Sequence, residues 1–124
     1  MALQVKKCFV SEIGIFGHSH GGGSTYNLAD RLNDRRGALG GFTIPFTSYV
    51  DAIKENSINA ETRFPPSASF LINYYQRDGV IDGGPVPAAD NHNVTAWGLG
   101  HGGIDNDARI IKAVSDSAKA KINP

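Results

Sequence analysis

Cysteine is almost absent from this 124-residue chain, and because Cys8 is the only one, no disulfide can form within it. No apolar run approaches the ~18 residues that a transmembrane helix needs, so we expect no membrane span. Neither sign of charge is in excess, since 12 Lys and Arg balance 12 Asp and Glu, and no basic nucleic-acid surface is indicated. We therefore expect neither nucleic acid as a partner nor a segment that crosses a membrane.

Residues 1–9 contain two lysines but lack the apolar block and small-residue cleavage site of a signal peptide. We therefore expect a cytoplasmic protein by default. A chain of 124 residues can bury one hydrophobic core but not two. Residues 1–124 are accordingly predicted to form a single domain.

Glycine, by contrast, is abundant at 15 residues, and it is clustered at 21–23, 40–41, 83–84 and 98–103. Such clusters indicate tight turns and close backbone approaches at chosen places rather than a flexible linker.

Four apolar segments are predicted to form strands, at 12–16, 46–52, 70–75 and 93–99. The second begins only after Pro45, because proline cannot donate to a strand ladder. After the first strand, apolar residues recur at helical spacing, which predicts a helix that ends with a C-cap at Gly37. The same spacing predicts a second helix over 104–122. Residues 3–9 suit either a short helix or a strand. This order predicts an α/β fold, with a small, mostly parallel sheet of about four strands flanked by helices.

The strongest motif is Gly17-His18-Ser19-His20-Gly21, between a predicted strand and a predicted helix. A serine at such a sharp turn needs small neighbours, and the turn lifts its hydroxyl above the carboxyl edge of the sheet. The free N–H groups of the helix N-terminus can stabilise negative charge there. We predict that Ser19 is a nucleophile and that the backbone N–H of His20 is an oxyanion donor. The alternative is a glycine-rich turn that only packs a helix on a sheet.

A serine hydroxyl is a poor nucleophile unless a base takes its proton. His101 is predicted to be that base, because it follows a strand and its glycine neighbours let the imidazole reach across the strand ends. His18 and His20 flank Ser19, and we expect their side chains to point away from the groove that the hydroxyl faces. His92 lies in a polar loop and is expected at the surface.

A carboxylate should accept a hydrogen bond from the base and fix its tautomer. Asp78 ranks first, because it directly follows strand 70–75, the neighbour in sequence of the strand before His101. Asp51, at the end of the preceding strand, ranks second, and Asp82, four residues beyond Asp78, ranks third. Each choice gives the chain order Ser, Asp, His.

These segments together resemble lipases and esterases of the α/β-hydrolase superfamily over about residues 10–112. The resemblance lies in the nucleophile turn and the acid and histidine loops, at residues 17–23, 73–78, 83–86 and 101–105. It implies a serine esterase or lipase without a cofactor, acting on carboxylic esters through Ser19, Asp78 and His101. Some members place the acid one strand earlier, which here is Asp51. The short chain favours small, short-chain esters.

The chain departs from this family because the strands that normally precede the nucleophile have no counterpart, nor has the loop that supplies a second oxyanion N–H. Strand 12–16 would then have an open outer edge unless residues 3–9 cover it. Open apolar edges pair with other chains. We therefore predict a homo-oligomer, most simply a symmetric dimer, with the first ten residues at or near the contact.

Three other interpretations remain open from the sequence. One is a metal-dependent hydrolase that uses His18 and His20, with His92 and His101 also available. Another is a catalytically weak or inactive remnant that acts as an interaction module. The third is a serine peptidase or thioesterase, because the nucleophile turn does not distinguish leaving groups.

Overall fold

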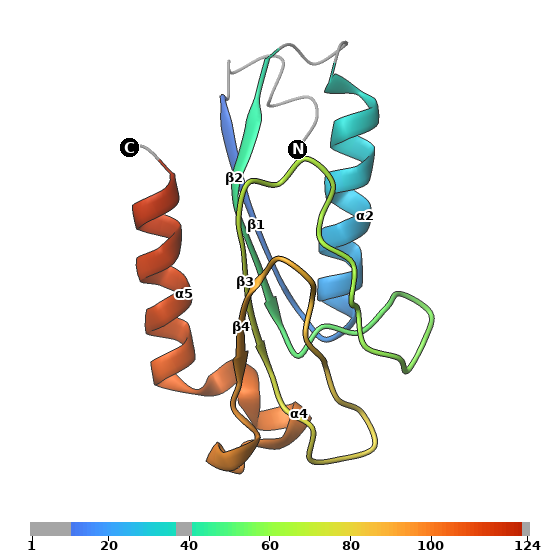
Figure 1. Ribbon diagram of the computed structural model, residues 1–124, viewed down its shortest axis with the longest axis vertical. Coiled ribbons are helices and arrows are strands. Elements are labelled where there is room, and N and C mark those ends of the chain that lie inside the picture. Colours follow the sequence, from blue (N-terminus) through green and yellow to red (C-terminus); the bar gives the residue numbers. More distant parts are fainter. Residues whose placement is uncertain (1–10, 37–40, 123–124) are drawn as a thin grey trace.

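A four-stranded parallel sheet forms the centre of the computed structural model, which describes residues 11–36 and 41–122 (Figure 1). The strands lie in chain order, and every neighbouring pair is parallel. Their bounds are β1 Glu12–His18, β2 Thr43–Val50, β3 Leu71–Tyr75 and β4 Asp90–Asn93. With helices beside the sheet, this confirms the predicted small α/β fold.

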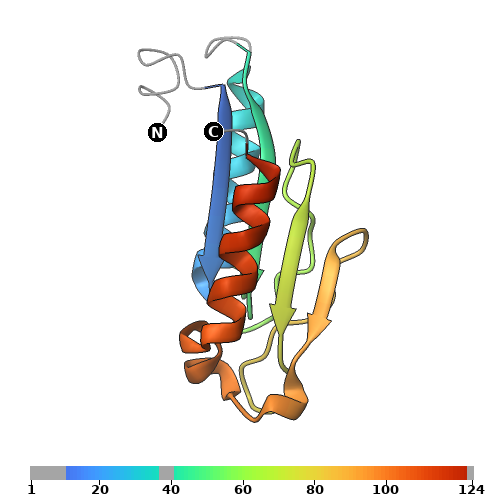
Figure 2. The ribbon, with the colours of Figure 1, turned by 90° about the vertical axis from the view of Figure 1, so that its left-hand side faces the viewer.

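Two long helices cover opposite faces of the sheet, α2 (His20–Asp34) on one and α5 (Ala108–Lys121) on the other (Figures 1 and 2). The cluster on the α2 side consists of Ile13, Ile15, Ala29, Leu32, Phe42 and Ile44. The larger cluster on the α5 side includes Phe46, Val50, Ile72, Tyr74, Ile110 and Val114. On the α2 side, β1 contributes Ile13 and Ile15, which lie two residues apart as the strand period of two requires.

Strand β2 begins earlier than predicted and includes Pro45. The register with β1 shifts here, because Glu12 pairs with Thr43 whereas Gly14 pairs with Phe46. The irregularity gives β2 one extra residue between these pairs, so the missing N–H of Pro45 falls where the ladder is already interrupted.

The prediction for the fourth strand was wrong in its bounds, since β4 ends at Asn93 and Thr95–Trp97 form the 3-10 helix η1. The Asn93 carboxamide oxygen accepts hydrogen bonds from both the N–H and the hydroxyl of Thr95, at 3.0 and 2.5 Å. These local bonds of the Asn93 side chain compete with the strand ladder, and the strand ends here. The apolar residue Val94 is buried in the α5-side core rather than in a ladder.

The C-terminal helix starts later than the predicted 104–122, because Asp107 caps it. The Asp107 side chain accepts from the N–H groups of Arg109 and Ile110. Its hydrogen bond with the Arg109 side chain, followed by those with the backbone, lowers the pKa of Asp107. Residues 104–106 form the separate 3-10 helix η2.

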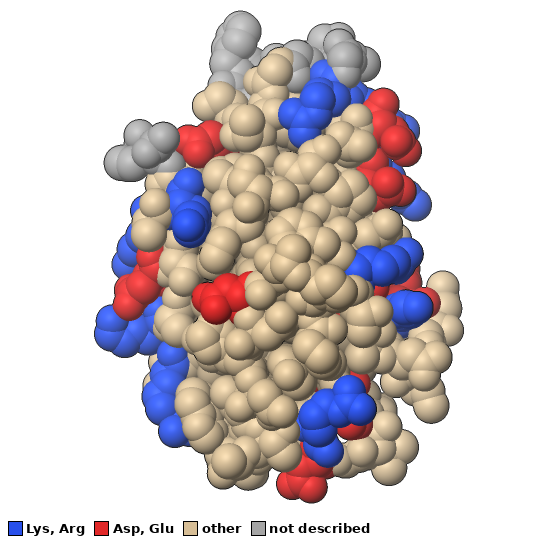
Figure 3. Space-filling model, viewed as in Figure 1, with Lys and Arg blue, Asp and Glu red and all other residues tan. Residues whose placement is uncertain are grey.

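Helix α2 ends at Asp34, and the proposed cap at Gly37 lies outside the described residues, as do residues 3–9. None of the helices in the described part is both long and apolar enough to cross a membrane. On the face drawn in Figure 3, Lys and Arg are interspersed with Asp and Glu around the margin.

Candidate active site

Ser19 lies at the turn between β1 and α2, directly after the last residue of the strand. Its φ of 56° and ψ of −127° are strained for a residue with a Cβ, at a cost of about 1–3 kcal/mol. Backbone hydrogen bonds hold it there, because its N–H donates to Val50 and its carbonyl accepts from Gly22 and Ile53. The strain is thus maintained by the end of β2 as well as by the helix.

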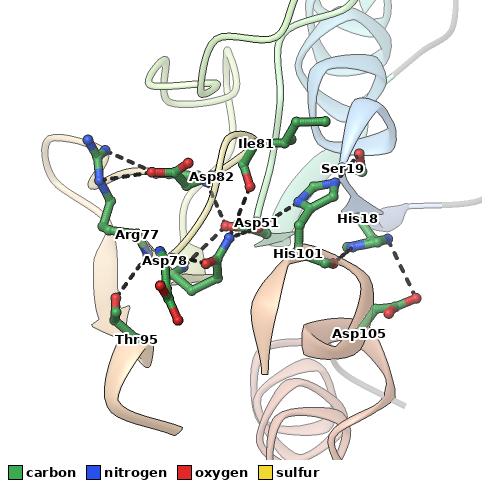
Figure 4. A network of polar contacts seen from close by, with 12 residues as sticks. His18, Ser19, Asp51, Arg77, Asp78, Ile81, Asp82, Thr95, His101 and Asp105 are labelled. Atoms are coloured by element: carbon green, nitrogen blue, oxygen red, sulfur yellow. Dashed lines mark hydrogen bonds and ion pairs between the residues drawn. The ribbon is translucent and has the colours of Figure 1, made fainter. Parts of the chain in front are cut away.

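The hydroxyl of Ser19 is not used to cap α2, although serine at this position usually caps a helix. Instead, Oγ lies 2.8 Å from Nε2 of His101 (Figure 4). His101 belongs to the short helix α4 (Gly100–Gly103), which follows β4 and η1 and crosses back below the strand ends. The predicted pair of Ser19 and His101 is therefore brought into direct contact.

The other ring nitrogen of His101, Nδ1, lies 2.6 Å from Oδ2 of Asp51. A proton on Nδ1, donated to the carboxylate, leaves the lone pair of Nε2 free to accept from the Ser19 hydroxyl. The hydrogen bonds therefore run unbroken from Ser19 through His101 to Asp51 (Figure 4).

Asp51 is fully buried at the end of β2. Its Oδ1 accepts from the backbone N–H groups of Gln76, at 3.2 Å, and Gly83, at 2.6 Å. Its Oδ2 accepts from Nε2 of Gln76 at 2.8 Å, in addition to His101. A buried carboxylate is tolerated only when its oxygens are satisfied in this way, so the surrounding donors fix Asp51 in place.

The contacts place the second-ranked candidate, Asp51, beside His101, and not the first-ranked one, Asp78. Within the part of the chain that the structure describes, Asp78 has no hydrogen bond or ion pair with His101, and its N–H donates to the Gln76 side chain. Asp82 is paired with Arg77 at 3.5 Å. The physical reason is that the His101 loop returns toward β1 and β2, where Asp51 lies, instead of staying beside β3 (Figure 4).

Two residues of this site were missed by the sequence analysis, Gln76 and Gly83. The glycine cluster 83–84 was a usable signal, since a Cβ at Gly83 would lie 2.7 Å from Oδ1 of Asp51. Gln76 gave no signal beyond its place directly after β3. Its carboxamide is braced by a hydrogen bond to the carbonyl of Ile81 at 3.1 Å.

The expectation that His18 points away from the site was wrong, because its Nε2 donates to the carbonyl of His101 at 3.2 Å. His20 does turn away, and its Nε2 contacts the carbonyl of Ser57 at 2.7 Å. His92 is half-buried, stacked on Tyr74 and paired with Asp90. The described residues contain no group of three or more His, Cys, Asp or Glu placed to hold a metal ion.

The backbone N–H of His20 is at the first position of α2, where no intrahelical acceptor exists. No other acceptor for it is found within residues 11–36 and 41–122. This N–H follows the Ser19 hydroxyl directly, as an oxyanion donor must.

Comparison of the chain with protein-family models, with curated proteins and with solved structures gave no match in any of the three. The resemblance to the α/β-hydrolase superfamily therefore stays a prediction. What this protein does must be argued from the geometry around Ser19.

Proposed function

We propose that the protein is a serine esterase that hydrolyses short-chain carboxylic esters with Ser19, His101 and Asp51 as its triad. The observation that supports this most is the hydrogen-bond chain from Ser19 Oγ to a buried carboxylate, with steps of 2.8 and 2.6 Å. The strained turn at Ser19, whose hydroxyl does not cap the helix that follows, also supports the proposal.

In the proposed reaction, Nε2 of His101 takes the proton of Ser19 while Oγ attacks the ester carbonyl. Asp51 holds the imidazole in the required tautomer and stabilises the imidazolium that forms. The N–H of His20 and the N-terminus of α2 stabilise the oxyanion. His101 then protonates the leaving alcohol, and water, activated by the same imidazole, releases the acid from Ser19.

The substrate size follows from the small fold. The described residues form one sheet, its helices and their connecting loops. No separate lid domain that could enclose a long acyl chain is found among them. One oxyanion donor is identified, and the loss of a second costs about 10²–10³ in rate in other hydrolases. We therefore expect measurable but modest turnover.

The test is covalent labelling with a fluorophosphonate, followed by hydrolysis of a short-chain nitrophenyl ester. We expect the wild type to be labelled at Ser19, as located by mass spectrometry, and Ser19→Ala to be unlabelled and inactive. Ser24→Ala, an exposed serine in the same helix, is the matched control and should behave as wild type. An unlabelled wild type, or equal ester hydrolysis by Ser19→Ala, would refute the proposal and favour an inactive interaction module.

The proposal includes a homodimer formed through β1, which is the edge strand of the described sheet. Phe16 on this strand is 55% exposed. Two apolar pockets of about 160 and 230 Å³ share Phe16, Val114 and Ser115 and run between β1 and α5. An edge strand of the described sheet beside exposed apolar surface favours pairing with a second copy. The first ten residues, expected at the contact, lie outside the described residues.

We expect light scattering at micromolar concentration to give the mass of a dimer, and Phe16→Lys to shift it to a monomer. Ile58→Lys is the control, because Ile58 is similarly exposed but lies in the loop after β2. A monomeric wild type would rule out this assembly.

A further inference from the structure

His18 makes two contacts with His101 and one with Asp105. Its Nε2 donates to the His101 carbonyl at 3.2 Å, and the two imidazole rings stack with centroids 5.3 Å apart at 29°. Its Nδ1 lies 3.5 Å from Oδ2 of Asp105, in η2 just beyond the loop that carries His101 (Figure 4). No atom of His18 or Asp105 takes part in the proton transfer between Ser19 and His101.

Apart from the hydrogen bonds of the His101 ring itself, helix α4 makes few contacts that could hold the loop in place. Gly98 and Gly100 adopt positive φ values of 67° and 65°, and Gly102 and Gly103 follow. Glycine has the largest backbone freedom to lose on folding. Helix α4 contains no buried residue and has no side-chain cap. Because its other three residues are glycine, His101 supplies its only side chain.

The chemistry of the partners orients His18. A carbonyl oxygen can only accept, so Nε2 of His18 must carry a proton. The Asp105 carboxylate lies 3.5 Å from Nδ1, so a ring turned over would lose its contacts with both partners. Both acceptors are partly buried beside the ring, whose side chain is 25% exposed.

We infer that His18 is a positioning residue, which with Asp105 clamps the backbone and ring of His101 to the nucleophile turn. Since His18 precedes Ser19 in the chain, the clamp ties the base directly to the nucleophile. It keeps Nε2 of His101 within 2.8 Å of Oγ. Its catalytic consequence rests on the proposed function, but its effect on the position of His101 does not.

The experiment compares His18→Ala with His18→Gln, whose carboxamide N–H can still donate to the His101 carbonyl. If Ser19 is an esterase nucleophile, kcat of His18→Ala falls about 10- to 100-fold with KM little changed, because misplacement by about 1 Å costs up to this much. His18→Gln recovers most of kcat. A role confined to stability would not produce this rescue.

The second readout is independent of turnover. The Nδ1 proton of His101, held 2.6 Å from Asp51, is expected to give a low-field proton NMR signal. We expect the signal in wild type and His18→Gln, and its broadening in His18→Ala. His92→Ala is the matched control, because His92 also pairs with an aspartate, Asp90, but has no contact with the site among the described residues.

An unchanged signal and unchanged kcat in folded His18→Ala would overturn the inference, and so would a failure of His18→Gln to restore the signal. If His18→Ala does not fold, Asp105→Asn decides, since it leaves the ring in place and removes its charged partner. Broadening then supports the clamp, and an unchanged signal overturns it. A wild type that fluorophosphonate does not label refutes the esterase alone, because the NMR comparison still decides the clamp.

Discussion

Asp51→Asn is expected to lower kcat for ester hydrolysis about 10⁴-fold, the size of loss that the same change causes in a serine protease triad. Asp78→Asn should leave kcat close to the wild-type value. The two residues are a matched pair, because both follow strand ends and both were candidates from the sequence. Only Asp51 contacts His101.

The expected loss follows from the donors around Asp51. Oδ1 accepts two backbone N–H groups, from Gln76 and Gly83, which cannot reverse their direction. The asparagine oxygen must therefore occupy that side, and its NH₂ group meets His101 Nδ1 and the Gln76 carboxamide. His101 avoids a clash of donors by adopting the other tautomer, with its proton on Nε2. That nitrogen then points an N–H at Ser19 and cannot take its proton.

The tautomer can be measured directly through the ¹⁵N shifts of His101, alongside kcat. We expect protonated Nδ1 in wild type and Asp78→Asn, and protonated Nε2 in Asp51→Asn. Thermal unfolding of both variants shows whether a loss of activity reflects unfolding instead. A large loss for Asp78→Asn with near-normal Asp51→Asn would restore the order of the sequence ranking.

The turn at Ser19 and its contact with His101 were predictable because their signals are local. A serine between a strand and a glycine-rich helix start can occupy few conformations, and the glycines around His101 mark a loop that is free to cross the strand ends. The carboxylate that contacts His101 was not predictable in the same way. Its identity depends on which strand end the His101 loop reaches, and that is set by packing between α4, η2 and the sheet.

His18 shows a different limit. Its side chain was expected to point away from the groove that the Ser19 hydroxyl faces. Alternation along a strand gives the face on which a side chain lies but not what approaches that face. Here the loop after β4 passes it, and the side chain contacts the His101 carbonyl.

Strand bounds failed where a side chain competed with the backbone ladder. The sequence after Asn93 is apolar enough for a strand, yet Asn93 caps the following turn. Pro45, expected to exclude its segment from β2, is accommodated because the pairing with β1 is already irregular there. Both outcomes depend on hydrogen bonds that periodicity does not contain.

The two glycines of the nucleophile motif offer the second large prediction, because the motif treats them alike and the structure does not. A Cβ at Gly17 would lie 2.1 Å from the carbonyl oxygen of Gly21 and 2.4 Å from Oγ1 of Thr25. A Cβ at Gly21 would meet nothing within 4 Å. We expect Gly17→Ala to lower kcat by about 100-fold and Gly21→Ala to leave it near wild type.

The difference has a structural reason. The carbonyl of Gly21 already accepts from the Thr25 hydroxyl at 2.8 Å, so a methyl group at Gly17 must push the first turn of α2 away from β1. That turn contains the His20 N–H, and Ser19 is held at its start by contacts with Gly22, Val50 and Ile53. Moving it shifts the hydroxyl relative to His101, whereas alanine at Gly21 lies within a helix that favours it.

Both variants should be measured for kcat and for unfolding in denaturant. Gly17→Ala is expected to lose about 1–3 kcal/mol of stability, as overpacked sites do, but to remain folded. Its activity loss should therefore persist at temperatures well below its unfolding transition. Equal effects of the two substitutions would mean that the turn is not packed against β1 as described, and that Ser19 is positioned by other contacts. A loss confined to Gly17→Ala would tie the strained turn at Ser19 to the close approach of one glycine to the first turn of α2.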